Sequence, residues 1–367
     1  MKKFVSGILA LAMVAATAVS SVASAAGSFI PGKDPNGDGV LTLADSVYIR
    51  QVLGGKFIPS DLTQLDVDDN CVVSMADVVM TQRAEIGIYS ASEMESADSP
   101  MNVEASTSTS RDYDVYKVNS TTHKCTYDRS YSLSVENDDN GISPYVYGGE
   151  DERDVTWKHI GVAKIMSDNT HTDVPYFGTG FVVGKHVIAT ARHVSKLAVT
   201  EQYGKMTEIL LINEDGRIKK LTPVEIHMPQ DTILGCDYSL ITVKEDLSDY
   251  MSFNLGMVTD YADDEQIEVS VVGYPMTVGT DDKANTDRMH RKYVGKGNVR
   301  FVNNKFRMGY TADTSGGNSG SPVYVTEIVN GVTYYTVVGI HTHEGNNGVR
   351  LTPETLKFFC GNTNFQY

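Results

Sequence analysis

Three segments of the chain carry the residue types that an acyl-transfer site needs. Ser319 lies in a glycine-rich run, residues 316–322, where the preceding glycines let the N–H groups of Gly317 and Ser319 converge. Donors placed in this way stabilise the oxyanion of a tetrahedral intermediate, by about 3 kcal/mol for a single donor. His193 follows an apolar segment and offers an imidazole that can accept the serine proton. Asp237 precedes another apolar segment and can fix the tautomer of that imidazole.

The order of these residues along the chain distinguishes between the known catalytic arrangements. His193 comes first, Asp237 second and Ser319 third, which is the chymotrypsin order and not that of subtilisin or the α/β-hydrolases. No glycine stands two residues after Ser319, so the run is not a G-x-S-x-G nucleophile elbow. Taken alone, His193 and Asp237 are more often structural, whereas the glycine-rich run at Ser319 is a plain turn in fewer cases. In this order they predict a catalytic triad, with Asp231 as the alternative carboxylate.

The segments around the three residues are typical of short β-strands. They are rich in β-branched and aromatic residues, and glycine, asparagine and aspartate turns separate them. Such strands at this spacing predict an all-β sandwich or barrels. The expected strands are residues 155–166, 176–190, 209–213, 239–243, 267–272, 305–312, 323–329 and 334–341. Only residues 352–359 look like a good helix here, with Thr352 as its cap and Pro353 in its first turn.

These segments resemble the chymotrypsin-fold serine proteases, and most closely the bacterial glutamyl endopeptidases. The resemblance runs from about residue 146 to residue 359 and is carried by residues 178–184, 189–194, 313–322 and 339–342. It implies two six-stranded β-barrels with the site in the cleft between them. It also implies hydrolysis of protein or peptide substrates through an acyl-enzyme on Ser319, with no cofactor in catalysis.

The resemblance also implies specificity for an acidic residue at P1, the position before the cleaved bond. Thr314 and His341 match the residues that hold an acidic side chain in that family. A hydroxyl donor and an imidazole that can be protonated suit a carboxylate. Asp313 stands where trypsin-like enzymes place the acid that binds arginine or lysine, and Glu344 follows His341 closely. We therefore expect cleavage after Glu or Asp, with a basic P1 preference as the alternative.

Residues 146–153 resemble the start of mature glutamyl endopeptidases. By that resemblance, the α-amine of Val146 would help to bind the P1 carboxylate after cleavage following Tyr145. Such a cut would release the N-terminal part of the chain unless a disulfide through Cys125 retained it.

The N-terminus has the pattern of an export signal. Lys2 and Lys3 precede an apolar stretch, and Ala23-Ser24-Ala25 supplies small residues at the positions that a signal peptidase reads. We expect residues 1–25 to be removed and the mature chain to work outside the cytoplasm. Disulfides are allowed there, and the four cysteines permit three full pairings, among which the sequence does not choose.

Two acidic loops, 32 residues apart, have the oxygen-ligand register of calcium loops. The first has Gly39 at its sharp turn. In the second, Cys71 replaces that glycine. A non-glycine residue at positive φ costs on the order of 1–2 kcal/mol, so we expect weaker binding there. The predicted ligands are Asp34, Asn36, Asp38, the Val40 carbonyl and Asp45 in the first loop, and Asp66, Asp68, Asn70, Val72 and Asp77 in the second.

A helix-like run follows each loop, residues 46–53 and 78–86, and no convincing helix precedes either. This duplicated half-hand, residues 31–88, resembles a type I dockerin, a small α-helical calcium-binding module. The resemblance implies a cohesin domain of a cellulosome scaffold as the partner, and hence an extracellular place at the cell surface. Leu43-Ala44 and Met75-Ala76 occupy partner-facing positions in such modules, although Leu43 and Met75 suit a local core equally well.

The domains predicted from these patterns are an export signal (1–25), a dockerin (31–88), a linker or pro-segment (90–145) and a trypsin-like protease domain (146–367). The formal charge of −16 argues against nucleic acid and anionic membranes as partners. Two other functions stay open. One is a non-catalytic domain that binds peptide in a protease-like cleft, and the other is a self-processing or toxin-like protease with a narrow target.

Overall fold

The structure is a computed structural model that describes the following parts of the chain. These are residues 24–25, 29–30, 32–56, 58–59, 61–85, 109–135, 152–156, 158–167, 176–199, 206–230, 236–259, 267–276, 278, 290–304, 306–329, 331–343 and 346–361. The predicted export signal lies outside them, apart from Ser24 and Ala25, and so do Val146, Asp231 and Glu344. In the described part of the chain no helix has the length and apolarity that crossing a membrane requires.

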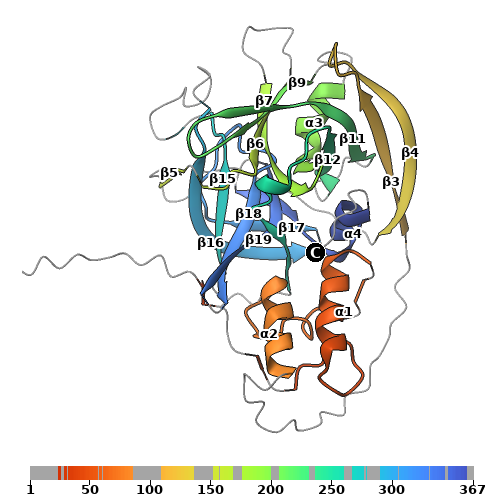
Figure 1. Cartoon of the computed structure of the whole chain (residues 1–367), viewed down its shortest axis with the longest axis vertical. Helices are drawn as coiled ribbons and strands as arrows, with labels where there is room; N and C mark the ends of the chain where they lie inside the picture. The colour runs from red at the N-terminus through yellow and green to blue at the C-terminus, as the bar shows by residue number, and fades with distance from the viewer. Residues whose placement is uncertain are drawn as a thin grey trace, which may run out of the picture.

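Six antiparallel strands close into a barrel in the C-terminal half of the chain (Figure 1). The ring closes because β18 pairs with β15 on one side and with β19 on the other. Valines at alternate positions of these strands fill its interior. In order around the ring the strands are β15 (Glu268–Gly273), β16 (Tyr293–Asn304), β17 (Arg307–Tyr310), β20 (Asn347–Arg350), β19 (Val332–His343) and β18 (Pro322–Val329).

The second sheet has nine strands and stays open. Its order is β10 (Ile218–Leu221), β9 (Met206–Ile212), β6 (Val162–Ser167), β7 (Tyr176–Gly184), β8 (Val187–Thr190), β12 (Ser239–Val243), β11 (Pro223–Pro229), β3 (Thr109–Val118) and β4 (Cys125–Val135). Only Thr222 separates β10, at one edge of the sheet, from β11, which lies beside β3 toward the other edge, so the sheet must curl back on itself. The fold is therefore mostly β, with one closed six-stranded barrel and one half-barrel. Where the sequence predicted a second six-stranded barrel, the described strands form this half-barrel, and the two together fit a chymotrypsin-like double barrel.

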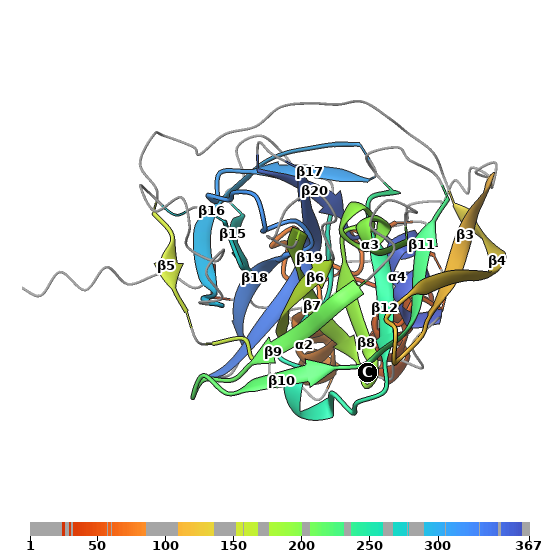
Figure 2. The same cartoon turned by 90° about the horizontal axis from the view of Figure 1, so that it is seen from above.

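A hairpin from the predicted linker extends one edge of the half-barrel. Strand β3 pairs with β11 from Tyr113–Pro229 to Lys117–Glu225, and β4 covers β3 (Figure 2). Burial alternates along β3 as in a strand with one covered face, since Arg111, Tyr113 and Val115 are buried. Residues 109–135 of the predicted linker or pro-segment are thus strands of this sheet, which is the arrangement of an N-terminal extension packed on the next domain.

The hairpin also packs against the far end of the chain. Helix α4 (Pro353–Gly361) is the predicted C-terminal helix, and Thr352 caps it by accepting the Thr355 N–H at 3.3 Å. The ring of Phe358 stacks on Tyr113 with centroids 4.5 Å apart. The Tyr113 hydroxyl in turn lies 2.9 Å from that of Tyr238, next to the predicted catalytic Asp237.

Two helices follow the two acidic loops, as the sequence predicts. They are α1 (Leu43–Leu53) and α2 (Met75–Glu85), which pack together and lie below the sheets in Figure 1. Thr42 and Asp45 form a capping box at the start of α1. The short strand β2 (Val72–Val73) of the second loop pairs with β14 (Met257–Val258) from the C-terminal half.

One helix was not predicted. Residues 192–199 form α3 (Arg192–Val199), directly after β8. The segment is short and contains β-branched Val194 and Val199, which weaken a helical signal in the sequence. Three further short strands pair at the margins of the barrel sheet: β1 (Ser24–Ala25), β5 (Asp154–Val155) and β13 (Asn254–Leu255).

Candidate active site

His193 and Asp237 form a direct pair in the half-barrel. The imidazole Nδ1 lies 2.7 Å from Asp237 Oδ2, and the His193 backbone N–H donates to Oδ1 at 2.8 Å. The histidine side chain is 41% exposed and the aspartate side chain only 10%. Because a carboxylate only accepts, Nδ1 must carry the proton, and Nε2 is left as the base. This is the geometry that a general base needs.

The strands around this pair hold both residues in place. β8 ends at Thr190 and pairs with Ser239 of β12, so α3 starts beside the segment that contains Asp237. The hydroxyls of Ser195 and Ser239 lie 2.6 Å apart and join the helix to the strand. The guanidinium of Arg192 donates to the carbonyl of Pro229 at 2.6 Å. His193 is thus carried on a helical turn that is anchored to two strands.

Ser319 approaches the same place from the closed barrel. Its carbonyl accepts the N–H of Thr179 on β7 at 2.8 Å, which links the serine loop to the half-barrel. A Cβ placed on Gly178 would lie 2.7 Å from the Val194 side chain and 3.0 Å from the Ser319 carbonyl. Gly178 therefore has both the residue after His193 and the serine backbone as close neighbours. Ser319 itself is partly exposed.

The turn before Ser319 has the conformation that a glycine allows. Gly317 has φ +92°, and a Cβ there would lie 2.4 Å from the Tyr274 carbonyl. Its carbonyl accepts the Thr179 hydroxyl at 2.8 Å, which fixes the peptide orientation. Within the described residues, the N–H groups of Gly317 and Ser319 donate to no protein acceptor. Both donors are therefore available to an oxyanion.

The two residues expected to bind an acidic P1 side chain are both buried and both hydrogen-bonded. The Thr314 hydroxyl donates to Asn346 Oδ1 at 2.7 Å, and His341 Nδ1 lies 2.5 Å from the Tyr310 hydroxyl. Burial raises the pKa of Tyr310 well above its usual value, so this hydroxyl stays neutral. Tyr310 and Asn346 carried no signal in the sequence, because neither stands at a fixed spacing from Ser319.

A basic P1 preference would require Asp313 to bind the substrate side chain, but this carboxylate has a hydrogen-bond partner within the protein. One of its carboxylate oxygens accepts the Glu152 N–H at 3.0 Å, and the neighbouring Arg153 donates to Ser315 Oγ at 3.0 Å. These contacts hold residues 152–155 against the barrel, where β5 pairs with β16. Asp313 thus has a structural partner near the predicted specificity pocket.

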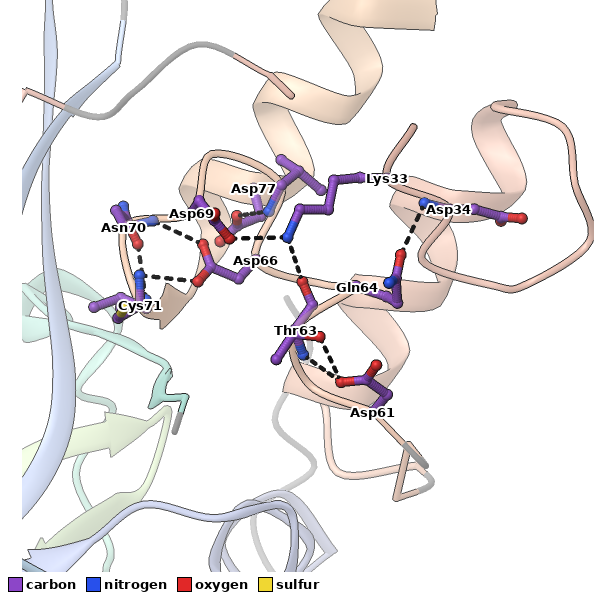
Figure 3. A network of polar contacts seen from close by, with 12 residues as sticks. Lys33, Asp34, Asp61, Thr63, Gln64, Asp66, Asp69, Asn70, Cys71 and Asp77 are labelled. Atoms are coloured by element: carbon purple, nitrogen blue, oxygen red, sulfur yellow. Dashed lines mark hydrogen bonds and ion pairs between the residues drawn. The ribbon is translucent and has the colours of Figure 1, made fainter. Parts of the chain in front are cut away.

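The predicted ligands of the second acidic loop lie together. Ligand atoms of Asp66, Asp68 and Asp77 are all within 4.8 Å of one another, and all three residues are buried. Figure 3 shows Asp66 and Asp77 of this group. Burial, and next the Asp68 charge, raises the pKa of Asp66 to about 7 and raises that of Asp77 well above normal. Crowded buried carboxylates are the donor chemistry of a hard divalent cation, so these residues fit calcium.

The first acidic loop is less compact. Among the described residues, Asp34, Asp38 and Asp45 do not form a comparable cluster. Asp34 accepts the N–H groups of Gly37 at 2.9 Å and Gly39 at 2.6 Å, so the loop is closed around this carboxylate. Gly39 has φ +84°, and Cys71 at the matching place has φ +64°. The positive φ expected for Cys71 is therefore present.

Replacing Gly317 tests the oxyanion turn. We expect Gly317→Ala to lower the rate of amide hydrolysis at least 100-fold, because the overlap with Tyr274 must displace the N–H donor. Gly331→Ala is the matched control, since Gly331 also has positive φ but open space around it. It should lose about 1 kcal/mol of stability and keep its rate. Equal rates for the two variants, measured as kcat/KM, would remove Gly317 from the site.

Asp237 and Asp231 can be separated in the same assay. Asp237→Asn should lower kcat about 10⁴-fold, because an amide at this place favours the wrong imidazole tautomer. Asp231→Asn should stay within a few-fold of the parent. If the second variant were the inactive one, the orienting carboxylate would be Asp231.

Residues 178–327, which include His193, Asp237 and Ser319, match the family model of the trypsin-like peptidase domain. The solved structures similar to this chain include a Glu endopeptidase in complex with MPD, at 17% identity and TM-score 0.45, over 59% of this chain and 98% of that one. Another is the protease Anisep from Arthrobacter nicotinovorans, at 15% identity and TM-score 0.39, over 56% and 99%. A third is the active form of the Rv3671c protease from M. tuberculosis, at 16% identity and TM-score 0.36, over 57% and 83%. The family match, taken with the closed barrel and half-barrel, supports a serine peptidase with a chymotrypsin-like fold.

Proposed function

We propose that the chain is a secreted serine endopeptidase that cleaves after Glu or Asp and is anchored to a cohesin-bearing scaffold. The observation that carries the peptidase part is the His193–Asp237 pair, set beside a serine loop with two available N–H donors. A peptide-binding domain without catalysis would not need this pair. No observation favours that alternative.

In the proposed mechanism, Ser319 Oγ attacks the substrate carbonyl while His193 Nε2 takes its proton. The carbonyl oxygen becomes an oxyanion, and the N–H groups of Gly317 and Ser319 stabilise it. The imidazolium then gives its proton to the leaving amine, and the C–N bond breaks to leave an acyl-enzyme. His193 then deprotonates a water molecule, which attacks the ester carbonyl. The C–O bond to Ser319 breaks, the imidazolium returns its proton to Ser319 Oγ, and the acid product is released. Asp237 stabilises the imidazolium at each stage and keeps its own charge.

Three features support acidic P1 specificity over the basic alternative. A neutral Tyr310 hydroxyl can accept from His341 Nδ1 and donate to the Asn347 carbonyl, 3.4 Å away. With these two hydrogen bonds in place, a protonated His341 would direct its Nε2–H to the carboxylate of the substrate. Arg153 adds a positive charge beside Ser315, and Asp313 is engaged by the Glu152 N–H. An arginine substrate would have to compete for that carboxylate.

The two acidic loops would bind calcium in a structural role, apart from catalysis. Asp34, Asn36, Asp38, Val40 and Asp45 would supply the first site, and Asp66, Asp68, Asn70, Val72 and Asp77 the second. Helices α1 and α2 start at these loops, so the ions would fix the starts of both helices. We propose that this module is a dockerin whose partner is a cohesin, which would hold the enzyme outside the cell.

Cleavage after Tyr145, with the Val146 amine joining the P1 site, remains part of the proposal. The released fragment would not simply diffuse away, because β3 pairs with β11 and β2 pairs with β14. Both pairings are formed by main-chain contacts, so this attachment would not require the disulfide through Cys125.

Covalent labelling tests the mechanism directly. A fluorophosphonate should label the wild-type chain at Ser319, and Ser319→Ala should lose both the label and about 10⁶-fold in kcat. The exposed Ser248→Ala variant is the control and should behave as wild type. Peptide mapping by mass spectrometry locates the label. Unchanged peptide cleavage by Ser319→Ala would refute the proposed nucleophile.

A set of peptides that differ only at P1 tests the specificity. Glu and Asp peptides should be cleaved at least tenfold faster than the Gln peptide, because only the carboxylate gains charge-assisted hydrogen bonds. Tyr310→Phe should reduce this Glu/Gln ratio and leave fluorophosphonate labelling of Ser319 unchanged. Faster cleavage after Arg or Lys would transfer the P1 role to Asp313.

A further inference from the structure

The two acidic loops have the same ligand register but different surroundings. A Cβ on Gly39 of the first loop would meet nothing within 4 Å, and the nearby Val40 and Leu43 are exposed. Cys71 of the second loop is buried and belongs to the apolar cluster of the closed barrel, together with Val258. The strain of a cysteine at positive φ is therefore offset by contacts that a glycine could not make.

Main-chain pairing joins the second loop to the barrel half of the chain. Val72 and Val73 pair with Val258 and Met257, and the Thr259 N–H donates to the Cys71 carbonyl at 2.8 Å. The two backbones are so close that a Cβ on Gly256 would lie 2.8 Å from the Val73 carbonyl. This is an interface between the helical module and the peptidase, formed by residues that also shape a metal loop.

Glu327 connects the barrel to the loop by its side chain. It lies on β18, is buried, and accepts the Ser74 hydroxyl at 3.0 Å and the Asn70 amide at 3.4 Å. Its other oxygen accepts the Thr336 hydroxyl of β19 at 2.7 Å. Ser74 Oγ also accepts the Ala76 N–H at the start of α2. One carboxylate of the barrel thus holds a predicted ligand residue and the first turn of a helix.

Several acidic residues meet at this interface. Glu327 is the fourth buried acid, beside Asp66, Asp68 and Asp77, and its charge acts on Asp77. The Lys33 ammonium is the nearby positive charge that acts on Asp66, but its ion pair is with Asp69, at 3.0 Å (Figure 3). Ligand atoms of Asp66, Asp68 and Asp77 lie within 4.8 Å of one another, so their charges repel, and a divalent ion bound between them would offset that repulsion.

We infer that the second loop and Glu327 form a metal-dependent clamp between the helical module and the peptidase barrel. The inference rests on the calcium sites of the proposed function. An ion at Asp66, Asp68 and Asp77 would hold the loop in the shape that presents Ser74 and Asn70 to Glu327 and β2 to β14. Calcium at this loop should therefore stabilise the barrel, whereas calcium at the first loop should order that loop alone.

Hydrogen exchange on the full-length Ser319→Ala chain tests the clamp, since this variant avoids self-digestion. Calcium, compared with EDTA, should slow amide exchange in β14 and β18 at least tenfold and raise the unfolding midpoint by about 5 °C. Asp77→Asn should abolish both effects. Asp45→Asn, the same loop position in the first repeat, should keep them.

Two results would overturn the clamp and leave the calcium assignment intact. One is calcium binding, measured by calorimetry, with no change of exchange in β14 and β18. The other is an equal loss of barrel protection in Asp45→Asn and Asp77→Asn. If calorimetry detects no calcium binding at either loop, the calcium assignment and the clamp both fail, while the peptidase assignment is judged by Ser319 labelling alone.

Glu327→Gln separates charge from packing, because the amide keeps an acceptor for Ser74 but removes one negative charge. In EDTA this variant should show slower exchange in β18 than the parent, since repulsion is lower. The slowing of exchange that calcium causes in β18, relative to EDTA, should fall below half of that in the parent. Glu327→Ala loses the acceptor as well and should exchange faster in both conditions. A Glu327→Gln variant that matched the parent in both conditions would refute the charge coupling.

Discussion

Thr179 connects the parts of the site, and the rest of the arrangement depends on its contacts. Its N–H donates to the Ser319 carbonyl, and its hydroxyl donates to the Gly317 carbonyl and accepts the Tyr274 N–H. Its own carbonyl accepts the Thr190 hydroxyl at 2.6 Å. One strand residue therefore joins the serine loop, the half-barrel and the end of β15. Buried hydrogen bonds of this kind fix geometry more than they add stability.

The sequence predicted the parts of the site that depend on local residue types. The order His193, Asp237, Ser319, the glycine turn and the helices after the acidic loops were all predicted from short motifs. In the structure His193 contacts Asp237, and a helix follows each acidic loop. The half-barrel was predicted less well. Its edge is covered by a hairpin whose partner strand β11 lies about a hundred residues further on, and no local pattern specifies such a pairing.

The specificity residues show the same limit at a finer scale. The spacing from Ser319 predicted Thr314 and His341 as specificity residues. Their hydrogen-bond partners Asn346 and Tyr310 stand at no fixed distance in sequence from Ser319, so no motif indicated them. Asp313 is the opposite case. Its position in the sequence suggested a pocket acid, and its hydrogen bond to the Glu152 N–H gives it a structural partner. Residue type can be read from a motif, whereas side-chain direction depends on tertiary contacts.

The second acidic loop has Cys71 where the first has Gly39, and packing against the barrel accounts for this difference. In the sequence, Cys71 is only a poor substitute for glycine, with a cost in backbone strain. In the fold, its side chain packs with the barrel cluster while its carbonyl accepts from Thr259. A module that served only as a flexible tether would not need these contacts. The two loops are thus unequal: Val40 and Leu43 of the first are exposed, whereas Cys71 of the second packs in the barrel cluster, so the same residues belong to the acidic loop and to the packing of the barrel.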